Sequence, residues 1–182
     1  MTENLKEQVS DLDFGVEKSM RYHSRMAGRY EVIHKISMFL TIAAGSAAFA
    51  EFLSENSMWF GAAAAVFAAY NLVYSPGLNA SSHRRLHDKF SDLAIEIRTS
   101  QESQENFNRW IACRLRIEQG EPAIFWALEA DCDNEVRRAW KRDSKLAVIG
   151  WWFRATMYIF RHTKKVFPPE VNPYYGGDYQ KT

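Results

Sequence analysis

Two long stretches without charged residues interrupt an otherwise polar chain. They run from Ile36 to Leu53 and from Met58 to Ser75, about 18 residues each, and only Glu51 near the end of the first carries a charge. At a rise of about 1.5 Å per residue, such a helix covers roughly 27 Å, close to the hydrocarbon thickness of a bilayer. The pattern therefore predicts two membrane-spanning helices. Because only about four residues separate them, they should form an antiparallel hairpin.

The residues that flank these stretches indicate an orientation. Basic residues lie before the first stretch and after the second, namely Lys18, Arg21, Arg25, Arg29, Lys35, Arg84, Arg85 and Lys89. Aromatic residues such as Trp59 and Tyr74 lie at the ends of the second stretch, where interfacial anchors are common. We expect both termini in the cytoplasm and the protein in the inner (plasma) membrane, with no cleaved signal peptide.

The polar segments around the hairpin show a helical period. Before it, the periodic positions are Leu5, Val9, Leu12, Val16, Met20, His23, Ala27, Tyr30 and His34. After it, they are Leu86, Phe90, Leu93 and Ile97, and then Phe107, Ile111 and Leu115. The spacing predicts one amphipathic helix that enters the first span and two helices after the second, with a break at 101–104 and a stop at Gly120.

Two further helices are predicted in the C-terminal third. One starts at Glu121-Pro122 and runs to about Trp140, with Ile124, Leu128, Cys132 and Val136 on one face. The other lies within 145–165 and is basic and aromatic. Its side chains Trp151, Trp152, Arg154 and Arg161 either face an anionic lipid surface or, in the case of the tryptophans, cover the cytoplasmic helices. The Pro- and Tyr-rich residues after Phe167 should be extended.

The predicted fold class is all-α, with a two-span domain at 1–145 and the basic aromatic segment and tail at 146–182. The formal net charge of +1 argues against a nucleic-acid-binding polycation, and the basic run Arg137–Arg142 is better explained as a surface for lipid or a partner. The competing interpretation is a soluble bundle with an Ala-rich buried hairpin. Cys113 and Cys132 are expected to be reduced thiols.

No motif for an enzyme, a metal or a cofactor is recognisable. The sequence has no phosphate loop, nucleophile elbow or zinc-protease motif. Asp131, Asp133 and Glu135 alternate in a predicted helix, so we interpret them as a solvated face. His83 and His87 lie four residues apart but lack a third ligand nearby, and we interpret them as a pair next to the membrane.

The predicted spans contain small and mildly polar residues. Gly45, Gly61, Ala65 and Ala69 would allow close helix packing in lipid, which suggests a homo-oligomer. Two helices cannot enclose a lumen, so a pore would need several protomers. The candidates to line it are Ser37, Thr41, Ser46 and Asn71. The alternative is that each of them only forms a hydrogen bond between helices or packs at a helix interface.

The sequences YHSRMAGRYEVIHK at Tyr22–Lys35 and EPAIFWALEADCDNEV at Glu121–Val136, on either side of the hairpin, resemble the SLATT family. These are two-transmembrane effector domains associated with SMODS nucleotidyltransferases and SLOG proteins in bacterial conflict systems. The resembling positions are Arg29, Tyr30, His34, Cys132, Asn134 and Glu135.

The resemblance implies an anti-phage effector that permeabilises the membrane when a separately encoded nucleotide-sensing or nucleotide-synthesising protein triggers it. The alternatives are a non-conducting membrane-anchored scaffold and a small phage membrane protein of exclusion or lysis type.

Overall fold

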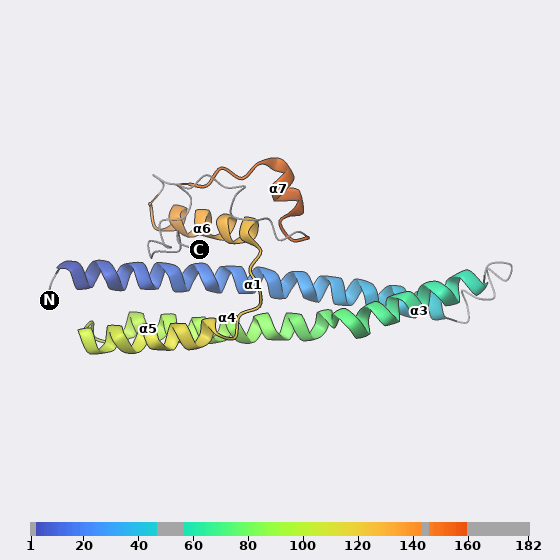
Figure 1. The fold of residues 1–182 in the computed structure, drawn as a ribbon, viewed down its shortest axis with the longest axis horizontal. Coiled ribbons are helices and arrows are strands. Elements are labelled where there is room, and N and C mark those ends of the chain that lie inside the picture. The colour runs from blue at the N-terminus through green and yellow to red at the C-terminus, as the bar shows by residue number, and fades with distance from the viewer. Residues whose placement is uncertain (1–2, 47–56, 143–145, 160–182) are drawn as a thin grey trace, which may run out of the picture. The chain divides into compact units, whose positions relative to one another are not determined.

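The computed structural model describes residues 3–46, 57–142 and 146–159, and these residues form helices and connecting segments only. The helices are α1 (Glu3–Gly45), α3 (Ser57–Tyr74), α4 (Pro76–Thr99), α5 (Gln104–Glu118), α6 (Trp126–Ala139) and α7 (Trp151–Thr156). The all-α prediction is therefore confirmed for the described residues (Figure 1). The chain divides into a hairpin unit, His23–His87, and a bundle unit, Met1–Tyr22 with Asp88–Thr182.

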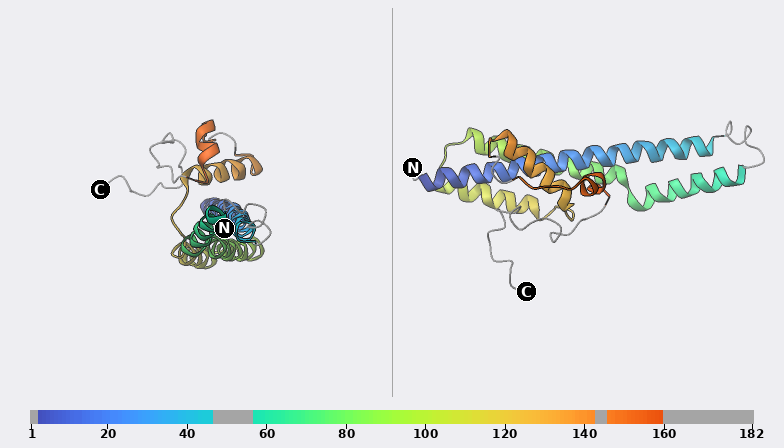
Figure 2. Two further views of the ribbon diagram at one scale, coloured as in Figure 1. Left: turned by 90° about the vertical axis from the view of Figure 1, so that its right-hand side faces the viewer. Right: turned by 90° about the horizontal axis from the view of Figure 1, so that it is seen from above.

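Helix α1 is a single helix of 43 residues, as the period of the N-terminal segment predicts. Leu5, Val9, Leu12 and Val16 are all buried. Phe14 and Tyr22 are buried too, although they lie outside the predicted stripe. The reason is that α1 is covered on two sides in the bundle unit: α4 and α5 lie on one side and α6 on the other (Figures 1 and 2).

The α4–α5 pair confirms the predicted break but corrects the face of α5. Helix α5 begins after Ser103, whose hydroxyl accepts a hydrogen bond from the Asn106 N–H at 3.1 Å. Ile111 and Leu115, predicted to face the core, are 36% and 54% exposed, whereas Trp110 is fully buried. Trp110 has more apolar surface to bury than either of them, so the helix is rotated to place it inside.

The predicted start of α6 at Glu121-Pro122 is wrong. Residues 121–125 are not helical, and the helix begins at Trp126. Phe125 has an extended backbone, and its N–H donates to the Tyr22 hydroxyl at 3.0 Å, which holds this segment against α1. Leu128, Cys132 and Val136 are fully buried, as their spacing of four predicts.

The predicted helix across 145–165 is also not continuous. Residues 146–150 are extended or irregular, and α7 has only six residues. The Asn134 side chain forms hydrogen bonds with both backbone polar groups of Ala147. Its Nδ2 donates to the Ala147 carbonyl at 2.8 Å, and its Oδ1 accepts from the Ala147 N–H at 2.7 Å. These groups are then not available to a helix. Residues 160–165 and the tail after Phe167 lie outside the described residues.

In the hairpin unit, α3 ends close to the predicted limit of the second stretch. Ser75 separates α3 from α4 with φ of 41°, a left-handed conformation that ends a helix, and Pro76 is the first residue of α4. In the part of the chain that the structure describes, no helix is both long and apolar enough to cross a membrane. Residues 47–53 of the first predicted span lie outside that part.

Candidate functional site in the hairpin unit

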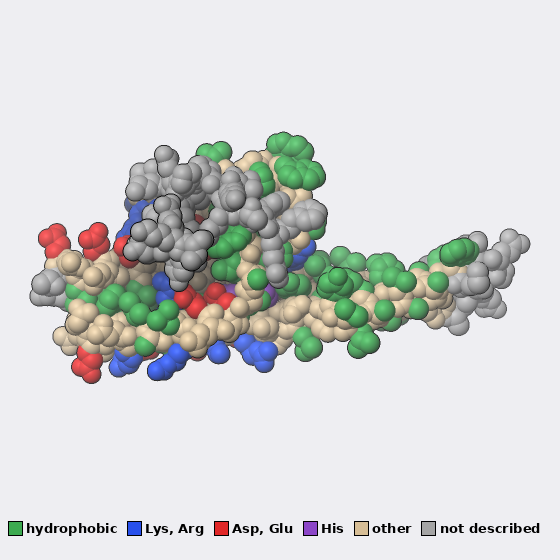
Figure 3. All heavy atoms as spheres, in the orientation of Figure 1, with side chains coloured by type: hydrophobic (Ala, Val, Ile, Leu, Met, Phe, Trp, Pro, Cys, Tyr) green, Lys and Arg blue, Asp and Glu red, His purple; other side chains and the backbone are tan. Residues whose placement is uncertain are grey.

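The outer face of the hairpin unit is apolar. From α1, the exposed large side chains are Val32, Ile36, Met38, Phe39 and Ile42, and from α3 and the start of α4 they are Trp59, Val66, Tyr70, Leu72, Val73, Tyr74 and Leu78. Phe39 is 69% exposed and Leu72 81%. On the face drawn in Figure 3, hydrophobic side chains gather along α3 and the adjoining part of α1.

Polar side chains of the same unit lie inside. The buried Ser37 hydroxyl is 2.6 Å from the Asn71 Oδ1, its partner across the two helices, and 3.0 Å from the His34 carbonyl. The Asn71 Nδ2 donates to the Phe67 carbonyl at 3.0 Å, which turns the amide oxygen toward Ser37. Thr41 donates to the Ser37 carbonyl at 2.8 Å. Three of the four candidate pore-lining residues thus form one connected set.

The fourth candidate, Ser46, lies apart from this set and donates to the carbonyl of Ala43 at 3.1 Å. The helix-packing candidates face outward: Gly45, Gly61, Ala65 and Ala69 are all exposed. A Cβ built on Gly45 or on Gly61 would meet nothing within 4 Å. The two glycines therefore have open space beside them within the described part of a single chain.

Charged side chains cluster where α1 and α4 meet within the unit. Glu31 bridges Lys35 at 2.8 Å and Arg84 at 2.7 Å. The hydrogen bond and charge of Lys35, followed by the charge of Arg84, lower the pKa of Glu31 below its ordinary value. The family-like residue Arg29 is half-buried nearby on α1. The Glu31 carboxylate thus forms ion pairs with Lys35 and Arg84, two of the basic residues that flank the predicted spans.

A histidine pair occupies the core of the unit. The Nδ1 atoms of His23 and His83 are 2.9 Å apart, and both rings are buried. Tyr30 stacks on His83 with ring centroids 5.6 Å apart. Burial lowers the pKa of His83 to about 4, and the charge of His23 contributes in the same direction. Sequence analysis predicts a pair of His83 with His87 on the same helix. In the structure, His83 on α4 instead contacts His23 on α1.

His34, a further family-like position, lies against the start of α4. A Cβ built on Gly77 would be 3.4 Å from the Cε1 and Nε2 atoms of the His34 ring, so the ring lies within van der Waals reach of that position. The His34 Nδ1 is buried and has no hydrogen-bond partner within the described residues.

The remaining family-like residues, Cys132, Asn134 and Glu135, all lie on α6 in the bundle unit. Cys132 is fully buried in α6, and Glu135 approaches Arg21 at 3.8 Å. Asn134 holds Ala147, as described above. The interpretation of the neighbouring acids as a solvated face is wrong for Asp133, which is buried and accepts a hydrogen bond from Arg137 at 2.6 Å.

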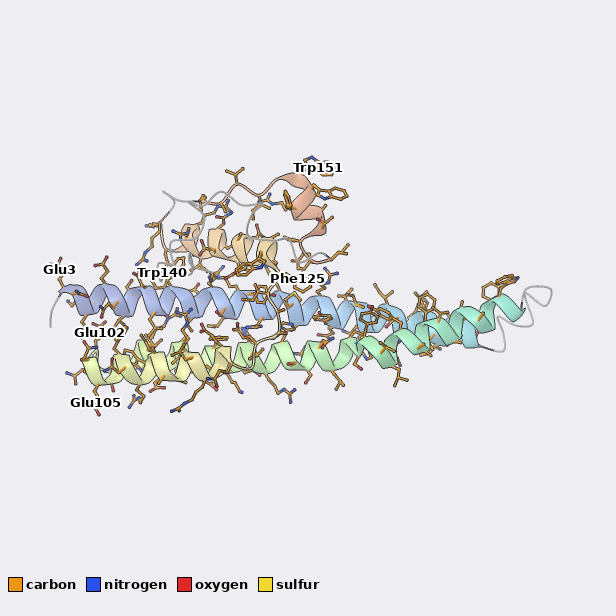
Figure 4. The ribbon with its side chains drawn as sticks, in the orientation of Figure 1. Glu3, Glu102, Glu105, Phe125, Trp140 and Trp151 are labelled. Atoms are coloured by element: carbon orange, nitrogen blue, oxygen red, sulfur yellow. The ribbon has the colours of Figure 1, made fainter. Side chains whose placement is uncertain are left out.

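The basic run at the end of α6 also differs from the predicted lipid- or partner-facing surface. Arg142 binds Asp11 at 2.9 Å, and the Trp140 indole, at the end of α6 in Figure 4, donates to Glu17 at 3.0 Å. Burial opposes ionisation of Glu17, but hydrogen bonds from Arg21 and Trp140 outweigh it and lower the pKa of Glu17. The basic run is thus partly used to attach α6 to α1.

The aromatic segment lies partly within the described residues. Trp151 and Trp152 are 79% and 55% exposed and pack edge to face, with ring centroids 5.7 Å apart, and Trp151 extends outward from α7 (Figure 4). Arg154 approaches Asp131 at 3.7 Å. Arg161 lies outside the described residues. Both tryptophan side chains are thus largely exposed in the described part of the chain.

No protein-family model, curated protein or solved structure matches this chain. Among the described residues, no group of three or more His, Cys, Asp or Glu side chains is arranged to hold a metal ion.

Proposed function

We propose that the two uncharged stretches of the hairpin unit, about 36–53 and 58–75, insert into a bacterial inner membrane as antiparallel spans and that the protein is a membrane-permeabilising effector. The observation that carries the proposal is the distribution of side chains in this unit. Large apolar side chains such as Phe39 and Leu72 face outward, while the Ser37 hydroxyl donates a hydrogen bond to the Asn71 amide oxygen inside the unit.

This distribution is the reverse of that in a water-soluble helical hairpin, which buries its apolar face and exposes its polar one. Soluble monomers rarely expose continuous apolar patches larger than a few hundred Å². In lipid, by contrast, an apolar outer face costs nothing, and polar groups must find partners within the protein. The Ser37–Asn71 and Thr41 hydrogen bonds meet that requirement.

Assembly of several protomers completes the proposal, since one hairpin cannot surround water. The exposed row Gly61, Ala65 and Ala69 is suited to contact a second copy, because small residues allow helices in lipid to approach closely. The SLATT resemblance implies the same role, with a nucleotide-linked partner as the trigger. Independently of that resemblance, the exposed Trp151 and Trp152 are suited to contact the lipid surface, where tryptophan side chains are common.

The test is overexpression of the full chain, so that a high concentration drives assembly without the partner, in bacterial cells loaded with a voltage-sensitive dye, after fractionation has located the protein in the membrane. The proposal predicts loss of membrane potential. An unchanged potential with confirmed insertion at high expression would leave the non-conducting scaffold instead, and a scaffold should also tolerate exchange of its hairpin for unrelated spans.

The assembly surface has its own matched control. Ala65→Leu adds bulk to the small-residue row, and Ala62→Leu makes the same change on an exposed position outside it. The oligomer distribution in mild detergent should shift toward smaller species only for Ala65→Leu. Equal distributions for both variants would contradict this interface.

A further inference from the structure

The segment that contains α7 carries large apolar side chains on its outer side, and we call this set the aromatic corner. Its members are Val148, Trp151, Trp152 and Ile159, which are 81%, 79%, 55% and 62% exposed. Hydrophobic side chains gather at α7 on the face drawn in Figure 3, and Trp151 extends outward in Figure 4. Single exposed apolar residues are common on proteins, but several within one short segment indicate a contact surface.

The inner side of the same segment is attached to the bundle unit. Ala147, Thr156 and Met157 are buried, and the backbone of Ala147 is held by the two hydrogen bonds from Asn134 on α6. The Thr156 hydroxyl donates to the Trp152 carbonyl at 2.7 Å. The aromatic corner therefore stands on a segment whose inner side is already occupied, and its own side chains face outward.

The charge of the segment indicates which surface it fits. Within residues 146–159 the one charged side chain is Arg154, which is 56% exposed and lies 3.7 Å from Asp131. The sequence contains no Asp or Glu from 144 to 169, and its basic residues there are Lys145, Arg154, Arg161, Lys164 and Lys165. A second copy of this segment would bring like charges together, whereas an anionic lipid surface would attract them.

We propose that the aromatic corner binds the headgroup region of an anionic membrane, with Trp151 and Trp152 entering the interface and Arg154 facing lipid phosphates. Tryptophan suits this region because its ring is apolar and its N–H is polar. The bundle unit then has a lipid contact of its own, besides the spans of the hairpin unit. The inference rests on the membrane location in the proposed function, not on permeabilisation, and it names the class of lipid.

The experiment uses the full chain with Cys113→Ser and Cys132→Ala, reconstituted into vesicles of phosphatidylcholine alone or with an equal amount of phosphatidylglycerol. A fluorescent label is placed on a single cysteine at Val148. A spin-labelled phosphatidylcholine quenches a label in lipid, and acrylamide quenches one in water. A label at Leu115, which is 54% exposed on α5 of the same unit, is the control.

The inference predicts that the Val148 label is quenched by the spin-labelled lipid only in vesicles with phosphatidylglycerol, and that high salt weakens this contact. The Leu115 label should stay accessible to acrylamide in both compositions. Equal lipid contact in both compositions, or an acrylamide-accessible Val148 label in the anionic vesicles, would overturn the inference. A label that neither reagent reaches lies against protein, from the same chain or another copy, and overturns it as well.

Variants test the parts of the aromatic corner. Trp151→Ser with Trp152→Ser should return the Val148 label to water in the anionic vesicles. Ile111→Ser with Leu115→Ser makes a comparable change at exposed positions of α5 and should leave the contact intact. Arg154→Gln should lower the ratio of lipid-facing to water-facing label by roughly fivefold. Lipid contact that persists without both tryptophans would contradict their role.

This contact and the insertion of the hairpin unit fail separately. A label at Phe39, on the outer face of the hairpin unit, reports insertion in the same vesicles. If Phe39 lies in lipid while Val148 stays in water, the surface contact alone is wrong. If Phe39 stays in water while Val148 meets anionic lipid, insertion and permeabilisation are wrong and the surface contact stands.

Discussion

The histidine pair predicts a specific pH dependence of local stability. In the folded hairpin unit the pKa of His83 is about 4, against an ordinary value of 6.5, because burial and the charge of His23 disfavour its protonated form. The opened state therefore binds the proton more readily. The stability of the closed pair is complete above about pH 6.5 and is lost as the pH falls toward 4, the reverse of what a histidine paired with a carboxylate would show.

The size of the effect follows from the two values. Between about pH 7 and about pH 5, the difference in proton binding destabilises the closed state by about 2 kcal/mol, and the full loss below pH 4 is about 3 kcal/mol. A change of 2 kcal/mol corresponds to roughly a thirtyfold change in the opening equilibrium.

Hydrogen–deuterium exchange of the full chain in detergent micelles measures this opening through peptides that cover residues 23–30 and 80–87. After correction for the intrinsic pH dependence of exchange, these peptides should lose protection by about thirtyfold at pH 5 relative to pH 7. In His83→Gln, which retains a hydrogen-bonding side chain without a titratable ring, most of the loss should disappear. The same pH dependence in both proteins would refute the reasoning.

Three further predictions concern single contacts. Asn134→Ala removes two hydrogen bonds to Ala147 and should lower the free energy of unfolding by about 2 kcal/mol in urea denaturation, with faster exchange around residue 147. Arg137→Met alone removes the ion pair of the buried Asp133 carboxylate and should lower the free energy of unfolding by about 3 kcal/mol, and adding Asp133→Leu should restore most of it. Ser37→Ala leaves the amide oxygen across the hairpin without its hydroxyl donor and should lower hairpin stability in micelles by about 1 kcal/mol, measured by thermal unfolding.

The periodic parts of the chain were predictable because burial follows helical spacing. Leu86, Phe90, Leu93 and Ile97 are buried as the spacing of α4 requires, and the turn at Pro76 follows from its fixed φ and missing N–H. These features depend only on residues close in sequence.

The features that sequence analysis missed depend on partners far along the chain. Asp133 looks like a surface acid until Arg137 and the surrounding core are in place, and the extended segment after α6 exists because Asn134 binds a backbone 13 residues away. The buried His23–His83 pair joins residues 60 positions apart. The only indication in the sequence is that His23 and His34 occur at positions of the helical period of α1, which are otherwise mostly apolar.

The most direct test of the central proposal is where the outward side chains of the hairpin unit lie. Spin labels placed singly at Phe39, Val66 and Leu72, in a background with Cys113→Ser and Cys132→Ala, report their surroundings in the full chain reconstituted into vesicles. The account predicts frequent collision with oxygen dissolved in lipid and protection from a water-soluble nickel reagent at all three positions. Ready access of the nickel reagent to these positions would contradict it.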